Sequence, residues 1–181
     1  MLQAGGLELV VDHVRGADED NPKGYFEDER VKDLASMEDR SWVRQARGKA
    51  VKVVSSLLPH LPDTNRYKVV FMQRNLHEVL ASQAKMLERR GEDTDTEDAR
   101  MLASFSSHLE KVRFQLRFRS YFDVLYLDYA DVVADPRREA ERMNAFVGGA
   151  LDVDSMVGAV DGSLYRNRMA APGEVPTAVT R

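Results

Sequence analysis

The chain of 181 residues carries 26 lysine and arginine residues against 30 aspartate and glutamate residues, which gives a formal net charge of -4. This balance argues against a general nucleic-acid-binding protein, which would need a strongly basic surface. The absence of cysteine excludes disulfides, thiolate metal sites and cysteine nucleophiles. No apolar run approaches the roughly 18 residues of a membrane-spanning helix, and residues 1–8 lack the pattern of a signal peptide. We therefore expect a soluble, cytoplasmic protein without a membrane or nucleic-acid partner.

Short apolar runs alternate with helical patterns along the whole chain. Gly5 and Gly6 would end a helix that contains residues 1–4. The apolar runs predict strands over residues 7–11, 50–54, 67–72 and 122–127. The helical patterns predict helices over residues 26–37, 41–47, 76–90, 99–119, 136–147 and 153–160. This order predicts a three-layer α/β domain over residues 1–168, with a doubly wound, mostly parallel sheet and an irregular tail over residues 169–181.

The first candidate for an anion-binding site follows the strand predicted over residues 67–72. In open α/β sheets, ligands bind beyond the carboxyl ends of the strands, and Arg74 stands at that point. Its planar guanidinium could hold a phosphate through two parallel hydrogen bonds. Ser82 lies on the same side of the following helix as Asn75 and Glu78, so its hydroxyl could add one more bond. The spacing alone leaves open that Arg74 is a solvated helix-start residue and Ser82 a small packing residue.

Residues 70–82 resemble the nucleotide-binding segment of the sulfotransferases that use 3′-phosphoadenosine 5′-phosphosulfate (PAPS). That family has an Arg-Asn-Pro-like turn after a strand, and a serine eight positions after the arginine, as Ser82 follows Arg74 here. The resemblance implies that Arg74 and Ser82 bind the 3′-phosphate of the donor. A second block, residues 122–136, resembles the family's later strand and its Asp-Pro helix start, and implies a shared fold.

The resemblance also points to residues for the transfer chemistry. Lys52 lies where many members have a strand that ends in Lys-Thr-His, although no histidine follows it here. Residues 21–27 resemble a segment that brings a lysine and a glutamate near the acceptor in bacterial and carbohydrate-modifying members. The implied roles are catalytic for Glu27, as the base, and for Lys52, and substrate-binding for Lys23. The residues alone leave another reading of Glu27 open, because acids are favoured in a first helical turn.

Two further comparisons with the family concern its phosphate-binding loops. Arg166 and Arg168 lie where the family has its last cofactor-binding loop, so they could reach a phosphate. The glycine-rich phosphosulfate loop, whose backbone N–H groups would cradle the anion, has no counterpart in this sequence. We therefore expect a P-loop NTPase-like sheet that lacks the first strand and the P-loop, because the true start lies upstream of Met1 or because the chain is a shortened relative.

Two functions from different classes follow from these observations. The first is a bacterial-type sulfotransferase that moves a sulfuryl group from PAPS to the hydroxyl or amine of a small-molecule or carbohydrate acceptor, without a metal. The second is a non-catalytic module that keeps the fold and binds a nucleotide or a partner. Another phosphate-handling α/β enzyme, such as a kinase, is a third alternative. The four histidines, His13, His60, His77 and His108, have no ligand spacing, so we expect no zinc site.

Overall fold

The computed structural model of the chain describes residues 1–18, 21–90 and 98–165. Its α-helices and strands are α1 (Trp42–Gln45), β1 (Tyr67–Gln73), α2 (Leu76–Arg90), α3 (Asp98–Phe118), β2 (Phe122–Asp128), α4 (Tyr129–Ala134), α5 (Pro136–Val147) and α6 (Val153–Gly158). Three 3₁₀ helices are η1 (Glu29–Val31), η2 (Ser55–His60) and η3 (Gly162–Leu164). The elements predicted after residue 66 are confirmed with small differences at their ends. No helix in the described ranges is both long and apolar enough to cross a membrane.

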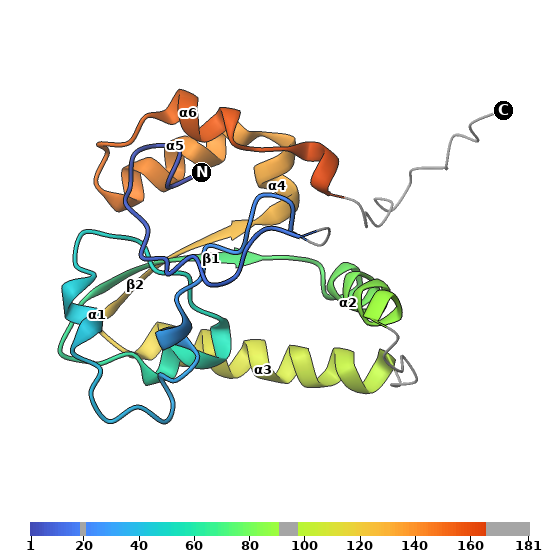
Figure 1. Cartoon of the computed structure of the whole chain (residues 1–181), viewed down its shortest axis with the longest axis horizontal. Coiled ribbons are helices and arrows are strands. Elements are labelled where there is room, and N and C mark those ends of the chain that lie inside the picture. Colours follow the sequence, from blue (N-terminus) through green and yellow to red (C-terminus); the bar gives the residue numbers. More distant parts are fainter. Residues whose placement is uncertain (19–20, 91–97, 166–181) are drawn as a thin grey trace, which may run out of the picture.

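β1 and β2 form a parallel pair, in register from Tyr67 opposite Phe122 to Gln73 opposite Asp128. Figure 1 shows α3 on one side of this pair and α5 and α6 on the other. The prediction of an α/β fold with a parallel sheet between helical layers is confirmed in this form. Because both strands run in the same direction, the residues that follow Gln73 and Asp128 meet at one edge of the sheet.

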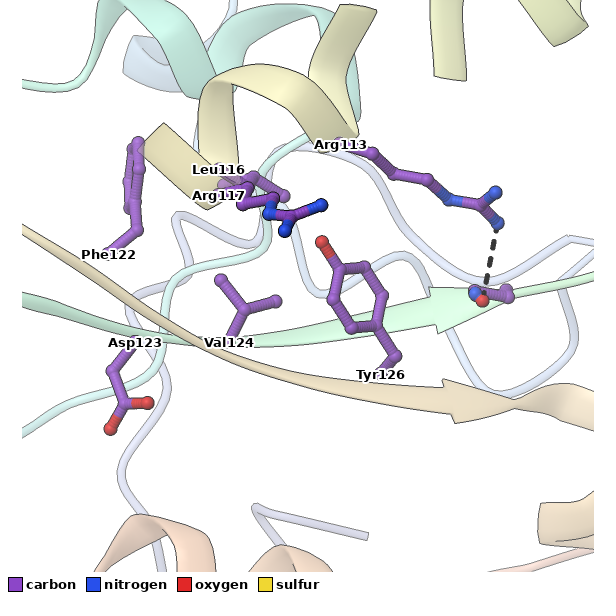
Figure 2. A pocket seen from close by; sticks show the side chains of 8 residues that line it. Arg113, Leu116, Arg117, Phe122, Asp123, Val124 and Tyr126 are labelled. Carbon is purple, nitrogen blue, oxygen red and sulfur yellow. Dashed lines mark hydrogen bonds between the residues drawn. The ribbon is translucent and has the colours of Figure 1, made fainter. Parts of the chain in front are cut away.

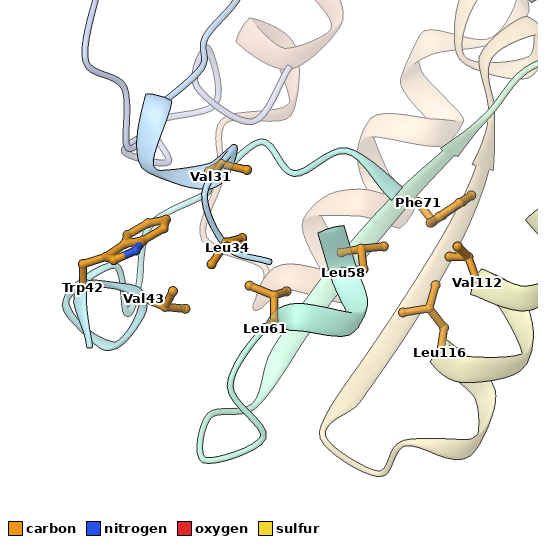
Figure 3. Packing of buried hydrophobic residues seen from close by; sticks show 9 residues of the cluster. All are labelled: Val31, Leu34, Trp42, Val43, Leu58, Leu61, Phe71, Val112 and Leu116. Carbon is orange, nitrogen blue, oxygen red and sulfur yellow. The ribbon is translucent and has the colours of Figure 1, made fainter. Parts of the chain in front are cut away.

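The sheet separates two apolar cores. On the α3 side, Phe71 packs with Val112 and Leu116 of α3 and with Leu58 of η2 (Figure 3). On the other side, residues of β2, α4, α5 and α6 form the second core; its most buried members are Leu127, Val132, Ala140, Met143 and Met156. Val70 of β1 packs against this second core. β1 therefore contributes apolar side chains to both faces, which is typical of a strand from the middle of a parallel sheet.

The strands predicted over residues 7–11 and 50–54 are corrected by the structure. These segments run parallel but meet at one isolated bridge, between Leu9 and Ala50. The ladder stops there because the N–H of Asp12 donates to the carbonyl of Glu27 (3.1 Å) instead of continuing along the neighbouring segment. His13 then adopts a left-handed conformation (φ 58°) and turns the chain away. In the described ranges, the doubly wound sheet is thus reduced to the two strands β1 and β2.

The helix predicted over residues 26–37 is also wrong. Phe26 has a left-handed backbone (φ 52°), and only Glu29–Val31 forms a short 3₁₀ helix. The turns that follow are closed mainly by hydrogen bonds between residues three apart. Val31 and Leu34 belong to the first core and Met37 packs against it, and their spacing of three places them on one side of a 3₁₀-like turn.

The first residues form one helical turn that ends as the sequence predicts. Gly5 donates to the carbonyl of Met1 (2.9 Å), Gly6 to that of Gln3 (2.9 Å) and Leu7 to that of Leu2 (3.0 Å). The last two bonds are the pair that defines a Schellman motif, and Gly6 has the positive φ (98°) that the motif requires.

Gly5 is the position in this turn where a side chain has no room. A Cβ atom there would lie 2.6 Å from Cγ of Met156 and 3.1 Å from Cβ of Leu151. We expect Gly5→Ala to lower the free energy of unfolding by about 1–3 kcal/mol, as overpacking does. Gly16→Ala is the matched control, because no atom lies within 4 Å of its Cβ position. Urea denaturation would measure both, and equal stability of the two variants would contradict the prediction.

Candidate active site

Arg74 lies at the carboxyl edge of the parallel pair, directly after β1. Tyr129 follows β2 at the same edge, and its ring centroid is 5.1 Å from Cζ of Arg74. Tyr165, near the end of the described chain, places its ring centroid 5.5 Å from the same atom. The two rings pack edge to face at 5.1 Å. Arg74 is 29% exposed, so its guanidinium is held among aromatic rings and still reaches the surface.

Glu78, one turn into α2, is the buried partner of Arg74. Its side chain is 3% exposed, and its Oε2 lies 3.4 Å from Nε of Arg74. The hydroxyl of Tyr165 donates to Oε1 of Glu78 at 2.8 Å. Burial, followed by this hydrogen bond to a carboxylate, raises the pKa of Tyr165 above its ordinary value. The phenol therefore stays protonated and remains a donor at neutral pH.

The helix predicted over residues 76–90 is confirmed, and Asn75 precedes its first residue. Its side-chain oxygen accepts a hydrogen bond from the N–H of His77 (2.9 Å), as an N-cap does. Ser82 lies half-buried in the middle of α2, on the helix side that also carries Glu78. Arg74, the N-terminus of α2 and Ser82 thus follow one another from the strand end along one helix. A guanidinium beside a helix N-terminus is a suitable environment for a phosphate.

Glu27 and Lys52 are separated by 25 residues, yet the structure brings them together. Nζ of Lys52 donates to Oε1 of Glu27 at 3.0 Å and to the carbonyl of Tyr25 at 2.9 Å. Nη1 of Arg15 lies 3.7 Å from Oε2 of the same carboxylate. Glu27 is 23% exposed and therefore presents an accessible carboxylate between two cations.

The backbone around Glu27 is held by residues that sequence reasoning missed. Tyr25 is 6% exposed, and its hydroxyl donates to Oδ2 of Asp18 at 2.6 Å. Arg15 stacks on the Tyr25 ring, with Cζ 3.3 Å from the centroid. Asp12 accepts hydrogen bonds from the N–H groups of Val14 (2.9 Å) and Glu29 (2.6 Å). No local spacing signals these contacts, because they lie within an unassigned loop, residues 12–25, or join it to a segment that the sequence pattern assigns to a helix.

Asp28 anchors the segment that carries Glu27, and it makes stability dependent on pH. Its buried carboxylate accepts from Nε (2.8 Å), Nη2 (2.7 Å) and the backbone N–H (3.0 Å) of Arg30. The hydrogen bond from the Arg30 side chain, opposed by burial, lowers the pKa of Asp28. A carboxyl group whose pKa is lower in the folded than in the unfolded protein stabilises the fold at pH values above its unfolded pKa. This stabilisation is lost as the pH falls through the folded pKa.

We therefore expect the free energy of unfolding to fall more steeply between pH 5 and pH 2, roughly the range of carboxylate titration, in the parent than in Asp28→Asn. The variant should be less stable at pH 7 by about 1–3 kcal/mol, because a buried hydrogen-bonded charge is lost. Denaturation curves across this pH range would test it, with Asp33→Asn as an exposed control. Parallel pH profiles for the parent and Asp28→Asn would contradict the prediction.

The remaining candidate residues lie elsewhere. Nζ of Lys23 donates to the carbonyl of Ala159 (3.2 Å) and lies 3.6 Å from Oδ2 of Asp161, so its contacts are with the C-terminal segment and not with Glu27. Arg166 and Arg168 lie outside the described residues. Among the described residues, the predicted site residues other than Lys23 therefore lie in two groups, one around Arg74 and one around Glu27 and Lys52.

A shallow groove of about 600 Å³ lies between α3 and β2, apart from the Glu27–Lys52 pair. Figure 2 shows Arg113 and Arg117 reaching from α3 over this groove, with Tyr126 of β2 below them. Nη2 of Arg113 is 3.4 Å from Oε1 of Gln73, the residue before Arg74. The groove adds two exposed cations over the parallel pair, of which Arg113 reaches the carboxyl end of β1, and none of its lining residues belongs to the predicted site.

The family assignment comes from a comparison with protein-family models. The model of the sulfotransferase domain matches residues 26–168, which is well over half of the chain. The chain belongs to the sulfotransferase family. No curated protein and no solved structure matches it. The matched range of this sulfotransferase contains Glu27, Lys52, Arg74 and Ser82, and it begins after Lys23.

Proposed function

We propose that this sulfotransferase-family protein moves a sulfuryl group from PAPS to the hydroxyl or amine of a small-molecule or carbohydrate acceptor. The observation that carries the proposal is the contact between Glu27 and Lys52, a carboxylate and an ammonium group 3.0 Å apart. An accessible carboxylate can accept a proton from an acceptor, and a cation beside it can face the negative charge of the transferred group.

In this mechanism Glu27 takes the proton of the acceptor group as the acceptor oxygen or nitrogen forms its bond to sulfur. The bond between sulfur and the 5′-phosphate oxygen of the donor breaks, and its electron pair leaves with adenosine 3′,5′-bisphosphate. Lys52 faces the oxygens of the transferred sulfuryl group, on which negative charge develops. Arg74 and the N-terminus of α2 hold the 3′-phosphate, and Ser82 adds a hydroxyl further along the helix.

The residues around Arg74 fit the 3′-phosphate end of PAPS. A partly exposed guanidinium precedes the N-terminus of a 15-residue helix, so a dianion there would meet both a charge and backbone N–H groups. For the 5′ side, the sequence contains no glycine-rich loop of the kind that cradles a phosphate. This feature favours the alternative function, a module that binds a nucleotide or a partner without catalysis.

A transfer assay and a binding measurement separate the two functions. The full chain would be incubated with radiolabelled PAPS and a panel of hydroxylated and amino acceptors, and titrated with adenosine 3′,5′-bisphosphate by calorimetry. Label transfer with turnover would support the enzyme. Binding of the bisphosphate without transfer to any acceptor would support the non-catalytic module. Neither binding nor transfer would contradict both functions.

A further inference from the structure

Glu78 is an unusual residue for the inside of a protein. Glutamate is almost never fully buried unless it is paired, yet Glu78 is 3% exposed. Its two carboxylate oxygens accept from different donors, Oε2 from Nε of Arg74 and Oε1 from the hydroxyl of Tyr165. Buried ion pairs are often no more stabilising than apolar residues of similar size. Fold stability alone is therefore a weak reason for a carboxylate at this position.

The contacts of Glu78 act on the orientation of Arg74. A guanidinium is planar, so a hydrogen bond at Nε fixes one edge of the group and sets the direction of the rest. The rings of Tyr129 and Tyr165 lie 5.1 Å and 5.5 Å from Cζ and restrict the guanidinium further. A long arginine side chain loses much rotamer freedom when it binds a ligand, and a side chain that is already ordered loses less.

We propose that Glu78 is a positioning residue for Arg74, and that Tyr165 supports it by holding the second carboxylate oxygen. The carboxylate fixes the Nε edge of the guanidinium, so that the group meets a phosphate dianion in one orientation. This inference rests on the proposed function, in which Arg74 binds the 3′-phosphate of the nucleotide. It assigns to the buried carboxylate an effect on ligand affinity that passes through Arg74 alone.

The test compares two ligands that differ in the group Arg74 would bind. Adenosine 3′,5′-bisphosphate carries the 3′-phosphate, and adenosine 5′-monophosphate lacks it. We expect Glu78→Gln to weaken binding of the bisphosphate by about tenfold, the scale of one hydrogen bond to a charged group, and to leave binding of the monophosphate unchanged. In an Arg74→Ala background the same substitution should change neither affinity.

A second variant keeps the test decisive if Glu78→Gln does not fold. Tyr165→Phe retains the ring beside Arg74 and removes the hydroxyl that donates to Glu78, so it should weaken binding of the bisphosphate by about two- to tenfold. Unchanged or tighter binding of the bisphosphate in the folded variants would overturn the positioning role. An equal loss for both ligands would overturn it too, because it indicates general damage to the site. If Arg74→Ala itself leaves bisphosphate binding intact, the proposed function of Arg74 fails instead.

Discussion

Arg74→Ala should weaken binding of adenosine 3′,5′-bisphosphate by about 2–5 kcal/mol, the range measured when one partner of a hydrogen-bonded charge pair is removed. The loss is large because the guanidinium lies among Tyr129, Tyr165 and the buried Glu78, where water screens its charge less than at an open surface. Calorimetric titration of parent and variant measures the difference.

Two controls make this result specific. Arg117→Ala removes an exposed arginine from the groove beside α3 and should leave the affinity unchanged. Arg74→Lys keeps the positive charge but loses the planar, bidentate geometry, so its affinity should lie between those of parent and alanine variant. Equal affinity of Arg74→Ala and the parent for the bisphosphate would remove Arg74 from the site.

Glu27→Gln should lower the rate of sulfuryl transfer by about 10²- to 10⁴-fold, the usual contribution of a general base. The amide keeps the shape of the side chain and a possible contact with Lys52, but it cannot accept the acceptor's proton. Affinity for adenosine 3′,5′-bisphosphate should not change, because Arg74 and α2 bind the nucleotide in our proposal. Initial rates with radiolabelled PAPS and calorimetry on the same samples would measure both effects.

Glu29→Gln is the matched control for this prediction. Glu29 lies two residues away, its side chain is 44% exposed, and its carboxylate pairs with Nζ of Lys32 at 2.6 Å. Its loss should leave the transfer rate unchanged. If Glu27→Gln transfers the sulfuryl group as fast as the parent while remaining folded, another group is the base.

The second half of the fold could be predicted because its signals are local. Pro136 begins α5 after the Asp135 cap, whose side chain accepts from the N–H of Arg138 (3.1 Å). Gly148, with φ 129°, ends the helix. The strand over residues 67–73 is recognisable because apolar residues occupy both of its faces. Each of these features depends on residues that are close in sequence, so no knowledge of distant contacts is needed.

In the first half, the turn that ends at Gly6 and the helix α1, inside the range predicted over residues 41–47, were predicted. The segments over residues 7–11, 26–37 and 50–54 were not, because they depend on contacts with distant residues. Residues 7–11 and 50–54 have the composition of strands, but their ladder ends where Asp12 bonds Glu27 instead. The left-handed backbone of Phe26 breaks a pattern that otherwise suits a helix. Strand propensity describes how well a side chain suits a sheet, not whether a partner strand is present.

For the candidate site, the sequence pointed to individual residues but not to the contacts between them. Glu27 and Lys52 received roles by resemblance, and the structure adds that they touch. From the sequence, Glu78 was placed only on the helix side of Ser82, whereas in the structure its carboxylate accepts from Arg74 and Tyr165. Tyr165 is 87 residues away from Glu78 in sequence, a separation at which helical spacing carries no information. Long-range polar contacts of this kind require the folded chain.

The second edge of β1, the one that does not pair with β2, has a consequence for any segment that could lie along it. Among the described residues β1 pairs along one edge, with β2, although both of its faces are apolar. Its other edge is a template of backbone donors and acceptors on which a further extended segment can add. Any segment that adds there in the parallel sense would run in the same direction as β1, with its carboxyl end toward Gln73. The residues that follow such a segment would then emerge at the edge of the sheet where Arg74 lies.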